Sequence, residues 1–350
     1  MNIEELVKDF DPVTLVKFKN YLSENLLNYC GKKNSNSKIV SAFKEKNNRC
    51  EKCYGKLNKN GKTKTGIQKY ICSSCGATYS ETTNTVIYHS KLPFSVWANI
   101  IDNLVDGFSI RRIAEQNHIS LKTSFDIRHK ILISLNEFIK NIELEGNIQA
   151  DEKYFSINLK GTKPKNMPRF SKKRSKGSNL AGISHHKICV VSAIDENNNV
   201  FLKIAGLGKC NKDMLDKTLK FKIKKVNSMN TDSASVYQSF CTENFIALHQ
   251  VPAGQHSRYQ ININSINGVH SQLTTWLSKF RGVSTRHLQE YLNWFNYIFT
   301  MKKRFTLANL KIESYINLIV NDNYIKSNNI CSIKMPIDLN VAYAEYNYQS

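Results

Sequence analysis

The sequence lacks any apolar run long enough to cross a membrane. Its longest apolar segments, such as residues 188–194, have the length of a single β-strand. A secretory signal peptide is not expected either, because Asn2, Glu4, Glu5 and Lys8 interrupt the apolar core that such a peptide needs. We therefore expect an intracellular protein with no membrane partner.

Acidic residues are scarce relative to basic ones. The 350 residues include 28 aspartates and glutamates against 50 lysines and arginines, which gives a formal net charge of +22. Such a charge attracts polyanions, of which nucleic acid is the commonest in a cell, although a ribosomal or membrane-surface protein is an alternative. Hydrophobic residues make up 41% of the chain, enough for a folded core, and the length suits about two or three domains.

The nine cysteines are an odd number and show no pattern of a disulfide framework. Four of them form two CxxC units separated by eighteen residues, namely Cys50, Cys53, Cys72 and Cys75. Two residues between thiolates let both sulfurs of a tight turn face one ion, so two such units predict a closed tetrahedral Zn²⁺ site. Gly55 and Gly76 suit the left-handed turns expected after each unit. Because so small a domain needs its metal to fold, we predict a structural zinc ribbon, with a strand at residues 68–71.

Residues 109–131 predict two short helices joined by a tight turn. Ser109 and Ser120 each suit a helix N-cap, with Asn117 and His118 in the turn between them. The residues expected to face inward are Ile110, Ile113, Ala114, Leu121, Phe125 and Ile131, and the helical register allows Arg128 to face either inward or outward. The second helix is expected to expose side chains for DNA contact, foremost Lys122, Thr123 and Arg128. A plain helical hairpin has the same pattern and is the alternative.

Beyond Gly146, short β-branched runs alternate with helical stretches. Strands are predicted at 148–157, 187–194 and 200–205, with a hairpin turn at 195–199, and two further strands end at 232 and 251. Helices are predicted from 212, from 233 and over 263–280. Three antiparallel strands followed by two that alternate with helices indicate the RNase H-like topology.

Charge is unevenly distributed in this region. Asp151 and Glu152 lie on the first strand, and no acidic residue follows until Asp195, whereas ten lysines and arginines lie between residues 153 and 187. A carboxylate beside a basic loop suits an enzyme that holds a divalent metal against a phosphodiester. Three residues of this loop are expected to bind DNA: Lys172, Lys173 and Arg174.

Five motifs follow one another along the chain: Asp151-Glu152-x-Tyr154, Gly182-Ile-Ser184 with Cys189-Val-Val-x-Ala-Ile-Asp195, Thr231-Asp232 with Tyr237, Ile266-Asn267-x-x-His270-Ser271-x-Leu273, and a block from Trp276 to Trp294. Together with the zinc ribbon they resemble the ISXO-like insertion-sequence transposases of the DDE type, in a DDNK-like form. The resemblance spans about residues 47–300, and its most distinctive part is the segment 267–294. The aromatic residues of that block are expected to pack in the core.

The resemblance implies that Asp151, Asp232 and Asn267 hold catalytic Mg²⁺ or Mn²⁺, with His270 as a further catalytic candidate. In this family the third position is Glu, Asn or His, often with Lys seven residues on, whereas this chain has Thr274 there. The resemblance also implies double-stranded DNA partners, both terminal inverted repeats and target DNA, bound by a homo-oligomer in the nucleoid of a bacterial cytoplasm.

The predicted fold class is α+β multidomain. The predicted segments are an N-terminal helical segment (1–46), the zinc ribbon (47–84), a helix-turn-helix region (90–146), an RNase H-like catalytic domain (147–305) and a C-terminal helical tail (306–350). The predicted function is metal-dependent DNA cleavage and strand transfer. A decayed or domesticated transposase that only binds DNA is the main alternative, and a stand-alone RNase H-like nuclease is another.

Overall fold

The computed structural model describes residues 49–63, 67–80, 82–92, 94–162, 184–252, 255, 257–258, 261–304 and 324–343. The predicted N-terminal helical segment, the loop residues Lys172, Lys173 and Arg174, and parts of the predicted C-terminal tail lie outside these residues. The chain divides into two compact units, Met1–Ser134 with Phe305–Cys331, and Leu135–Arg304 with Ser332–Ser350. Among the described residues, no helix combines the length and apolar character needed to span a membrane.

The first unit contains a small antiparallel sheet and a group of helices. Strands β1 (Leu57–Lys62), β2 (Gln68–Cys72) and β3 (Thr78–Ser80) pair in that order, which confirms the strand predicted before the second CxxC unit. The helices are α4 (Phe94–Val105), α5 (Ile110–Gln116), α6 (Leu121–Ser134) and α13 (Ser327–Cys331). Helix α4 buries Trp97, Ile100, Ile101 and Leu104 along one side, as expected of an amphipathic helix.

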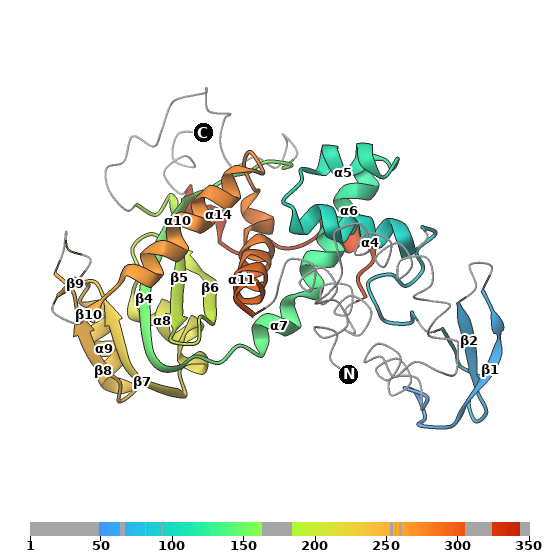
Figure 1. Ribbon diagram of the computed structural model, residues 1–350, viewed down its shortest axis with the longest axis horizontal. Coiled ribbons are helices and arrows are strands. Elements are labelled where there is room, and N and C mark those ends of the chain that lie inside the picture. The colour runs from blue at the N-terminus through green and yellow to red at the C-terminus, as the bar shows by residue number, and fades with distance from the viewer. Residues whose placement is uncertain are drawn as a thin grey trace, which may run out of the picture. The chain divides into compact units, whose positions relative to one another are not determined.

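The second unit is built on a five-stranded mixed sheet with the order β6-β5-β4-β7-β8 (Figure 1). Its strands are β4 (Glu145–Ser156), β5 (Lys187–Asp195), β6 (Val200–Leu207), β7 (Lys225–Thr231) and β8 (Ala247–Gln250). Strand β5 is antiparallel to both of its neighbours, β4 and β6, whereas β7 and β8 run parallel to β4. The strand order and directions agree with the predicted RNase H-like topology.

Helices connect and cover these strands. They are α7 (Asn136–Lys140), α8 (Lys212–Thr218), η2 (Lys220–Lys222), α9 (Val236–Glu243), α10 (Asn264–Ser278), η3 (Thr285–His287), α11 (Leu288–Arg304) and α14 (Leu339–Ala342). A two-stranded sheet of β9 (Ser257–Arg258) and β10 (Ile261–Asn262) precedes α10. The predicted hairpin turn joins β5 to β6, where Asn198 adopts a positive φ of 59°.

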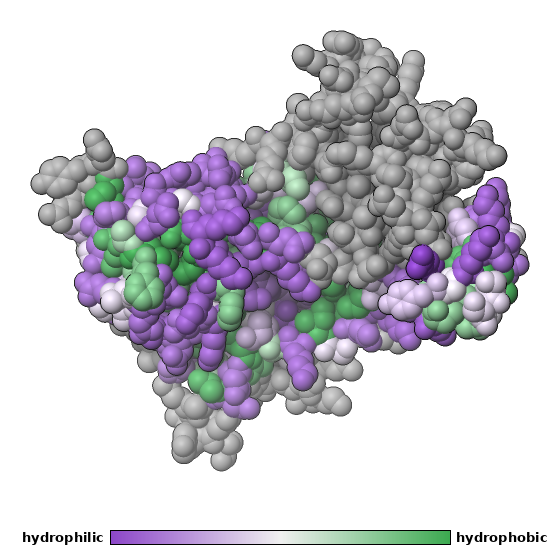
Figure 2. All heavy atoms as spheres, turned by 90° about the horizontal axis from the view of Figure 1, so that it is seen from below, coloured by the Kyte–Doolittle hydropathy of each residue, from purple (hydrophilic) through white to green (hydrophobic). Residues whose placement is uncertain are grey.

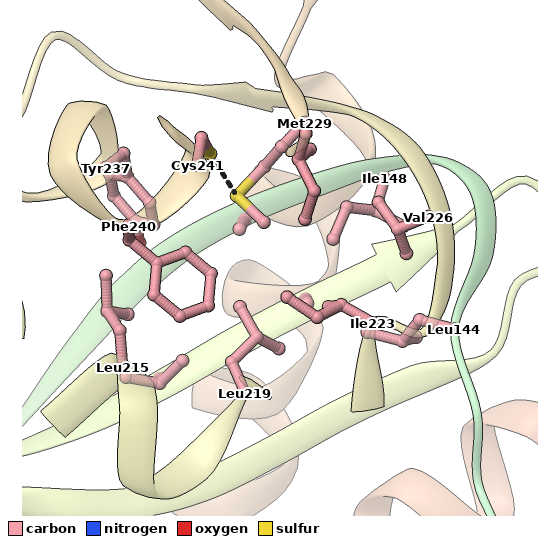
Figure 3. Packing of buried hydrophobic residues seen from close by; sticks show 14 of the residues in the cluster. Leu144, Ile148, Leu215, Leu219, Ile223, Val226, Met229, Tyr237, Phe240 and Cys241 are labelled. Atoms are coloured by element: carbon pink, nitrogen blue, oxygen red, sulfur yellow. Dashed lines mark hydrogen bonds between the residues drawn. The ribbon is translucent and has the colours of Figure 1, made fainter. Parts of the chain in front are cut away.

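Each face of the large sheet carries its own hydrophobic core, because side chains alternate along the strands. On one face, residues of β4 and β7 pack against α8 and α9, and the thiol of Cys241 lies 3.7 Å from the sulfur of Met229 (Figure 3). On the other face, β5 and β6 pack against α10 and α11. There Trp276 meets Phe280 and Trp294 edge to face, with ring centroids 4.8 and 5.0 Å apart. Trp294 is buried as predicted, whereas Trp276 and Phe280 are only partly buried.

The described surface is largely polar. Figure 2 shows hydrophilic residues over most of the described part of one face, with smaller hydrophobic areas among them. The large apolar side chains exposed within the described residues are Tyr54, Leu121, Phe221, Phe245 and Val341.

Candidate functional site

Strand pairing places the two predicted catalytic aspartates at the same level of the sheet. In the parallel pair of β4 and β7, Gln149 lies opposite Asn230. Asp151 is two residues beyond Gln149 on β4, and Asp232 is two residues beyond Asn230, directly after the end of β7. The pairing therefore brings together two carboxylates that are about eighty residues apart in the sequence.

Hydrogen bonds orient both aspartates. Asp151 accepts the backbone N–H of Glu152 at 2.8 Å, and Asp232 accepts that of Ala234 at 3.0 Å. The side-chain amide of Gln250, on β8, donates to the carbonyls of Asp232 and Ala234 at 3.1 Å each. The loop after β7 is thus held by the neighbouring strand, which fixes the position from which Asp232 projects.

The electrostatics of the site disfavour negative charge on Asp151. Burial raises the pKa of this carboxyl from 3.8 to about 7, and the nearby charges of Glu152 and Asp232 raise it further. Like-charged carboxylates in a partly buried position destabilise each other unless a cation or a proton lies between them. The arrangement therefore favours binding of a positive ion.

Helix α10 lies along β4 on the Asp151 face, and an amide side chain fixes its position. Gln149 accepts the backbone N–H of Ile266 at 3.1 Å and donates to Asn262 at 3.1 Å. The N-cap residue of α10, Ile263, provides no side-chain cap, so Gln149 satisfies from β4 one of the N–H groups that a helix N-terminus leaves free. Gln149 was not predicted as a site residue, although its position two residues before Asp151 on the same face of the strand was a usable signal.

His270, on α10, contacts Asp151. Its Nδ1 lies 3.4 Å from an Asp151 carboxylate oxygen. Burial lowers the pKa of His270 to about 4, and the charge of Lys153 lowers it further, so near neutral pH the ring is uncharged and this contact is no ion pair. The other ring nitrogen, Nε2, is buried with no hydrogen-bond partner among the described residues. Asn267 is partly buried one helical turn earlier.

Glu152 lies on the opposite face of β4 from Asp151. Its carboxylate accepts a 2.6 Å hydrogen bond from the hydroxyl of Tyr237, a fully buried residue of α9. Burial raises the pKa of Glu152, and the Tyr237 hydrogen bond partly opposes that rise. Glu152 therefore lies behind the Asp151 face of the strand and ties β4 to α9.

The donors at this corner fit a divalent cation. Asp151 and Asp232 provide carboxylate oxygens, the ligands preferred by Mg²⁺, and the unpartnered His270 nitrogen and the Asn267 amide lie on the adjacent helix. The ligand atoms of Asp151, Asp232 and His270 do not gather within 4.8 Å of one another as those of the cysteine cluster do.

The four predicted zinc ligands converge in the first unit. Their sulfurs all lie within 4.8 Å of one another, with Cys50 3.5 Å from Cys75 and Cys53 3.4 Å from Cys72. A Zn²⁺ ion bound tetrahedrally at about 2.3 Å from each sulfur separates the sulfurs by about 3.8 Å, so the cluster has the right dimensions. The hydroxyl of Tyr79 lies 3.2 Å from the sulfur of Cys50 and lowers the pKa of that thiol to about 6, which favours the thiolate form.

The two CxxC turns have the same backbone hydrogen bonds. The N–H of Cys50 donates to the Gly55 carbonyl at 2.9 Å, and that of Cys72 donates to Ala77 at 2.8 Å. The prediction that Gly55 adopts the left-handed turn is wrong, because Tyr54 has the positive φ of 58°; Gly76 does have one, 68°. Gly55 is needed for its size, since a Cβ there would lie 2.5 Å from the Ser74 hydroxyl and 3.0 Å from the Cys72 sulfur.

Helices α5 and α6 form at the predicted positions, with the predicted caps. The hydroxyl of Ser109 accepts the N–H of Arg112 at 3.3 Å, that of Ser120 accepts the N–H of Thr123 at 3.0 Å, and His118 in the turn has a positive φ of 50°. Ile113 and Ala114 are buried as predicted. Leu121, expected to face inward, is instead 52% exposed, and buried Ser124 makes the contact between the two helices by donating to the Ile110 carbonyl.

The structure separates the three DNA-contact candidates of α6. Lys122 is exposed and pairs with Asp126 one turn along the helix, and Thr123 is partly buried, with its hydroxyl 2.8 Å from that of Ser120. The expectation that Arg128 is exposed is wrong. Its side chain is 1% exposed and its guanidinium donates to the Phe108 carbonyl, so it holds the segment before α5 against α6. Arg128 therefore has a structural role in this unit.

Comparisons with known proteins agree with the motifs. Residues 143–300 match the family described as the ISXO2-like transposase domain. A Halobacterium salinarum protein, described as an uncharacterized protein in transposable element ISH50, is 24% identical over 239 residues, which cover 65% of this chain and 77% of the relative.

Solved structures with some likeness include the Mos1 Strand Transfer Complex, at 14% identity over 65% of this chain and 78% of that chain, with a TM-score of 0.28. Another is the simian T-cell lymphotropic virus intasome in complex with PP2A regulatory subunit B56 gamma, at 12% identity over 57% and 67%, also with a TM-score of 0.28. Scores this low support no argument about fold or function. The family match and the insertion-element relative confirm the predicted resemblance: residues 143–300 are similar to the ISXO2-like transposase domain, and the chain is similar to a protein of an insertion element.

Proposed function

We propose that this chain binds the terminal inverted repeats of an insertion sequence and catalyses metal-dependent cleavage and transfer of DNA strands. The observation that carries the proposal is the register of β4 and β7, which sets Asp151 and Asp232 side by side while α10 lies against Asp151. In such a site a bound divalent cation activates a water or 3′-hydroxyl and stabilises the leaving oxygen.

The residues of the chain have distinct parts in this proposal. Asp151 and Asp232 hold the metal, and the third ligand comes from α10, through either Asn267 or His270. Gln149 holds α10 in place, and Glu152 with Tyr237 ties β4 to α9 behind the site. Mg²⁺ and Mn²⁺ are the metals that suit this donor set.

The first unit supplies DNA recognition in this proposal. The cysteine cluster holds a structural Zn²⁺ ion, and α5 with α6 forms a helix-turn-helix in which Lys122 and Thr123 face DNA. The basic residues Lys172, Lys173 and Arg174 add phosphate contacts. Two DNA ends are joined by a homo-oligomer of the chain.

Cleavage of a duplex that carries the border of the element tests the proposal. Asp151→Ala and Asp232→Ala are expected to abolish cleavage while DNA binding stays near that of the unsubstituted protein, because these carboxylates serve the metal. Exposed Asp213→Ala, on α8, is the matched control and keeps activity. Cleavage that survives in Asp151→Ala refutes the assignment of the site.

Substitutions on α10 identify the third ligand. If Asn267 provides it, Asn267→Ala impairs cleavage and Asn267→Glu preserves it, and activity depends on higher Mg²⁺ because a neutral amide binds the cation less strongly than a carboxylate. If His270 provides it, Asn267→Ala stays active, His270→Ala does not, and Mn²⁺ supports more activity than Mg²⁺ because it accepts nitrogen ligands better.

The same assay separates the proposal from the binding-only alternative. The observation that favours that alternative is Thr274, which stands where the family often has Lys. Specific binding to the element border with no cleavage under either metal indicates a decayed protein that only binds DNA.

A further inference from the structure

Lys153 continues the series of residues that face α10 from β4. Side chains two apart on a strand point to the same face, so Gln149, Asp151 and Lys153 share one side of β4. Gln149 accepts the N–H of Ile266 at 3.1 Å, and a carboxylate oxygen of Asp151 lies 3.4 Å from Nδ1 of His270. These two contacts show that α10 and β4 run side by side in the same direction, as Figure 1 also shows.

Extending the series by one step puts Lys153 and Thr274 at the same level along the strand and the helix. Two residues advance a strand by about 6.6 Å, and four residues advance a helix by about 6 Å. Each step of two residues on β4 therefore matches a step of four residues on α10. Residue 149 is paired with 266 and residue 151 with 270, so residue 153 is expected to be paired with 274. Thr274 brings no charge to this level, and its hydroxyl donates to the His270 carbonyl of its own helix at 2.7 Å.

Lys153 provides the positive charge at this position. The ammonium takes part in none of the ion pairs between described residues. Lys153 is also only partly buried, so its flexible side chain can meet an anion from solvent.

We propose that Lys153 binds a backbone phosphate of the DNA strand that enters the site at Asp151 and Asp232, and so supplies the charge that Thr274 lacks. The inference rests on the proposed function. An ammonium group suits this contact because it binds phosphate as a compact point charge without requiring a fixed geometry. The competing role is neutralisation of the two carboxylates, which involves no contact with DNA.

A phosphate-by-phosphate binding experiment distinguishes these roles. The full chain, without added divalent metal, is titrated with synthetic duplexes that span the border between the element and its flanking DNA. In each duplex one phosphate is replaced by an uncharged methylphosphonate. Unsubstituted protein is compared with Lys153→Met, Lys153→Arg and the control Lys203→Met, which removes an exposed lysine from β6.

The expected result is coupling between Lys153 and one phosphate near the cleaved bond. Neutralising that phosphate weakens binding of the unsubstituted protein, Lys153→Arg and Lys203→Met by about three- to tenfold, but leaves Lys153→Met unaffected. Lys153→Met also binds the unmodified duplex more weakly and lowers the slope of log affinity against log salt by about 0.9.

The inference is overturned if every methylphosphonate weakens Lys153→Met and the unsubstituted protein equally. Carboxylate neutralisation is then the role of Lys153, and Mg²⁺ raises the melting temperature of Lys153→Met more than that of the unsubstituted protein. Cleavage by the unsubstituted protein is scored separately. Coupling without any cleavage refutes the transposase activity but keeps the phosphate contact, whereas cleavage without coupling refutes the phosphate contact alone.

Discussion

Replacement of Asp151 by Asn is expected to stabilise the metal-free protein, and more so as the pH rises. The folded state holds a proton on Asp151 more tightly than the unfolded chain does, because burial raises the pKa from 3.8 to about 7. A group whose pKa is higher in the folded state than in the unfolded state stabilises the fold fully at pH values below its unfolded-state pKa. This contribution is lost as the pH rises through its folded-state pKa. Asn has a similar shape and does not titrate, so the variant avoids this loss.

The structure sets the size of the effect. A pKa difference of about three is worth about 4 kcal/mol, which is the ceiling, because the side chain is 20% exposed and solvent screens part of the penalty. The advantage of Asp151→Asn in unfolding free energy should therefore grow by up to about 1.4 kcal/mol per pH unit between about pH 4 and 7, then level off.

Urea unfolding at a series of pH values measures this difference. Trp97 lies in the first unit, so a Trp97→Phe background restricts the tryptophan signal to Trp276 and Trp294 in the second. Exposed Asp213→Asn is the control and should show no such slope. Excess Mg²⁺ should cancel much of the difference at pH 8, since the cation stabilises charged Asp151. A stability difference that is constant from pH 4 to 8 refutes the reasoning.

Three further predictions concern other parts of the chain. Purified protein should contain one zinc per chain and Cys72→Ser none, whereas Cys331→Ser, a change at an exposed cysteine, should retain it by metal analysis. Arg128→Met should cost about 2–4 kcal/mol of stability in the first unit, against almost none for exposed Arg111→Met; a stable variant that merely binds DNA less tightly contradicts the buried role. Gln149→Leu should speed hydrogen exchange in the first turn of α10, whereas Gln289→Leu should affect only the contact between α11 and β6; equal exchange in both variants argues against Gln149 as the anchor of α10.

Much of the architecture of the second unit could be predicted from the sequence, because its signals are local. Alternating β-branched runs marked β5 and β6, and the polar turn at 195–199 marked their hairpin. The carboxylate positions followed from strand order, since Asp151 lies within the first strand and Asp232 directly follows the fourth. Parallel pairing then determined their proximity without any knowledge of side-chain contacts.

The errors concern orientation, which local patterns specify poorly. Arg128 lies at a helical spacing that fits either the inner or the outer side of α6, and arginine is rarely buried, so the exposed position was the natural expectation. The buried position of Arg128 depends on a partner twenty residues earlier in the chain. The Phe108 carbonyl needs a hydrogen-bond donor, and the guanidinium of Arg128 provides it. Tyr54 likewise adopts a left-handed conformation because the CxxC turn demands it, while the neighbouring Ser74 requires that Gly55 be small.

The third metal ligand shows the same limit at the site itself. Asn267, His270 and Thr274 share one stripe of α10, so helical periodicity cannot say which of them faces Asp151. That choice depends on how far the helix is displaced along β4, and the displacement is set by the hydrogen bond between Gln149 and Ile266, residues 117 positions apart. With this anchor, His270 reaches Asp151. A shift of three or four residues along the helix axis, about 4.5–6 Å, would bring Asn267 or Thr274 to the carboxylate in place of His270. The identity of the third ligand is therefore a property of the contact between helix and strand and not of the motif alone.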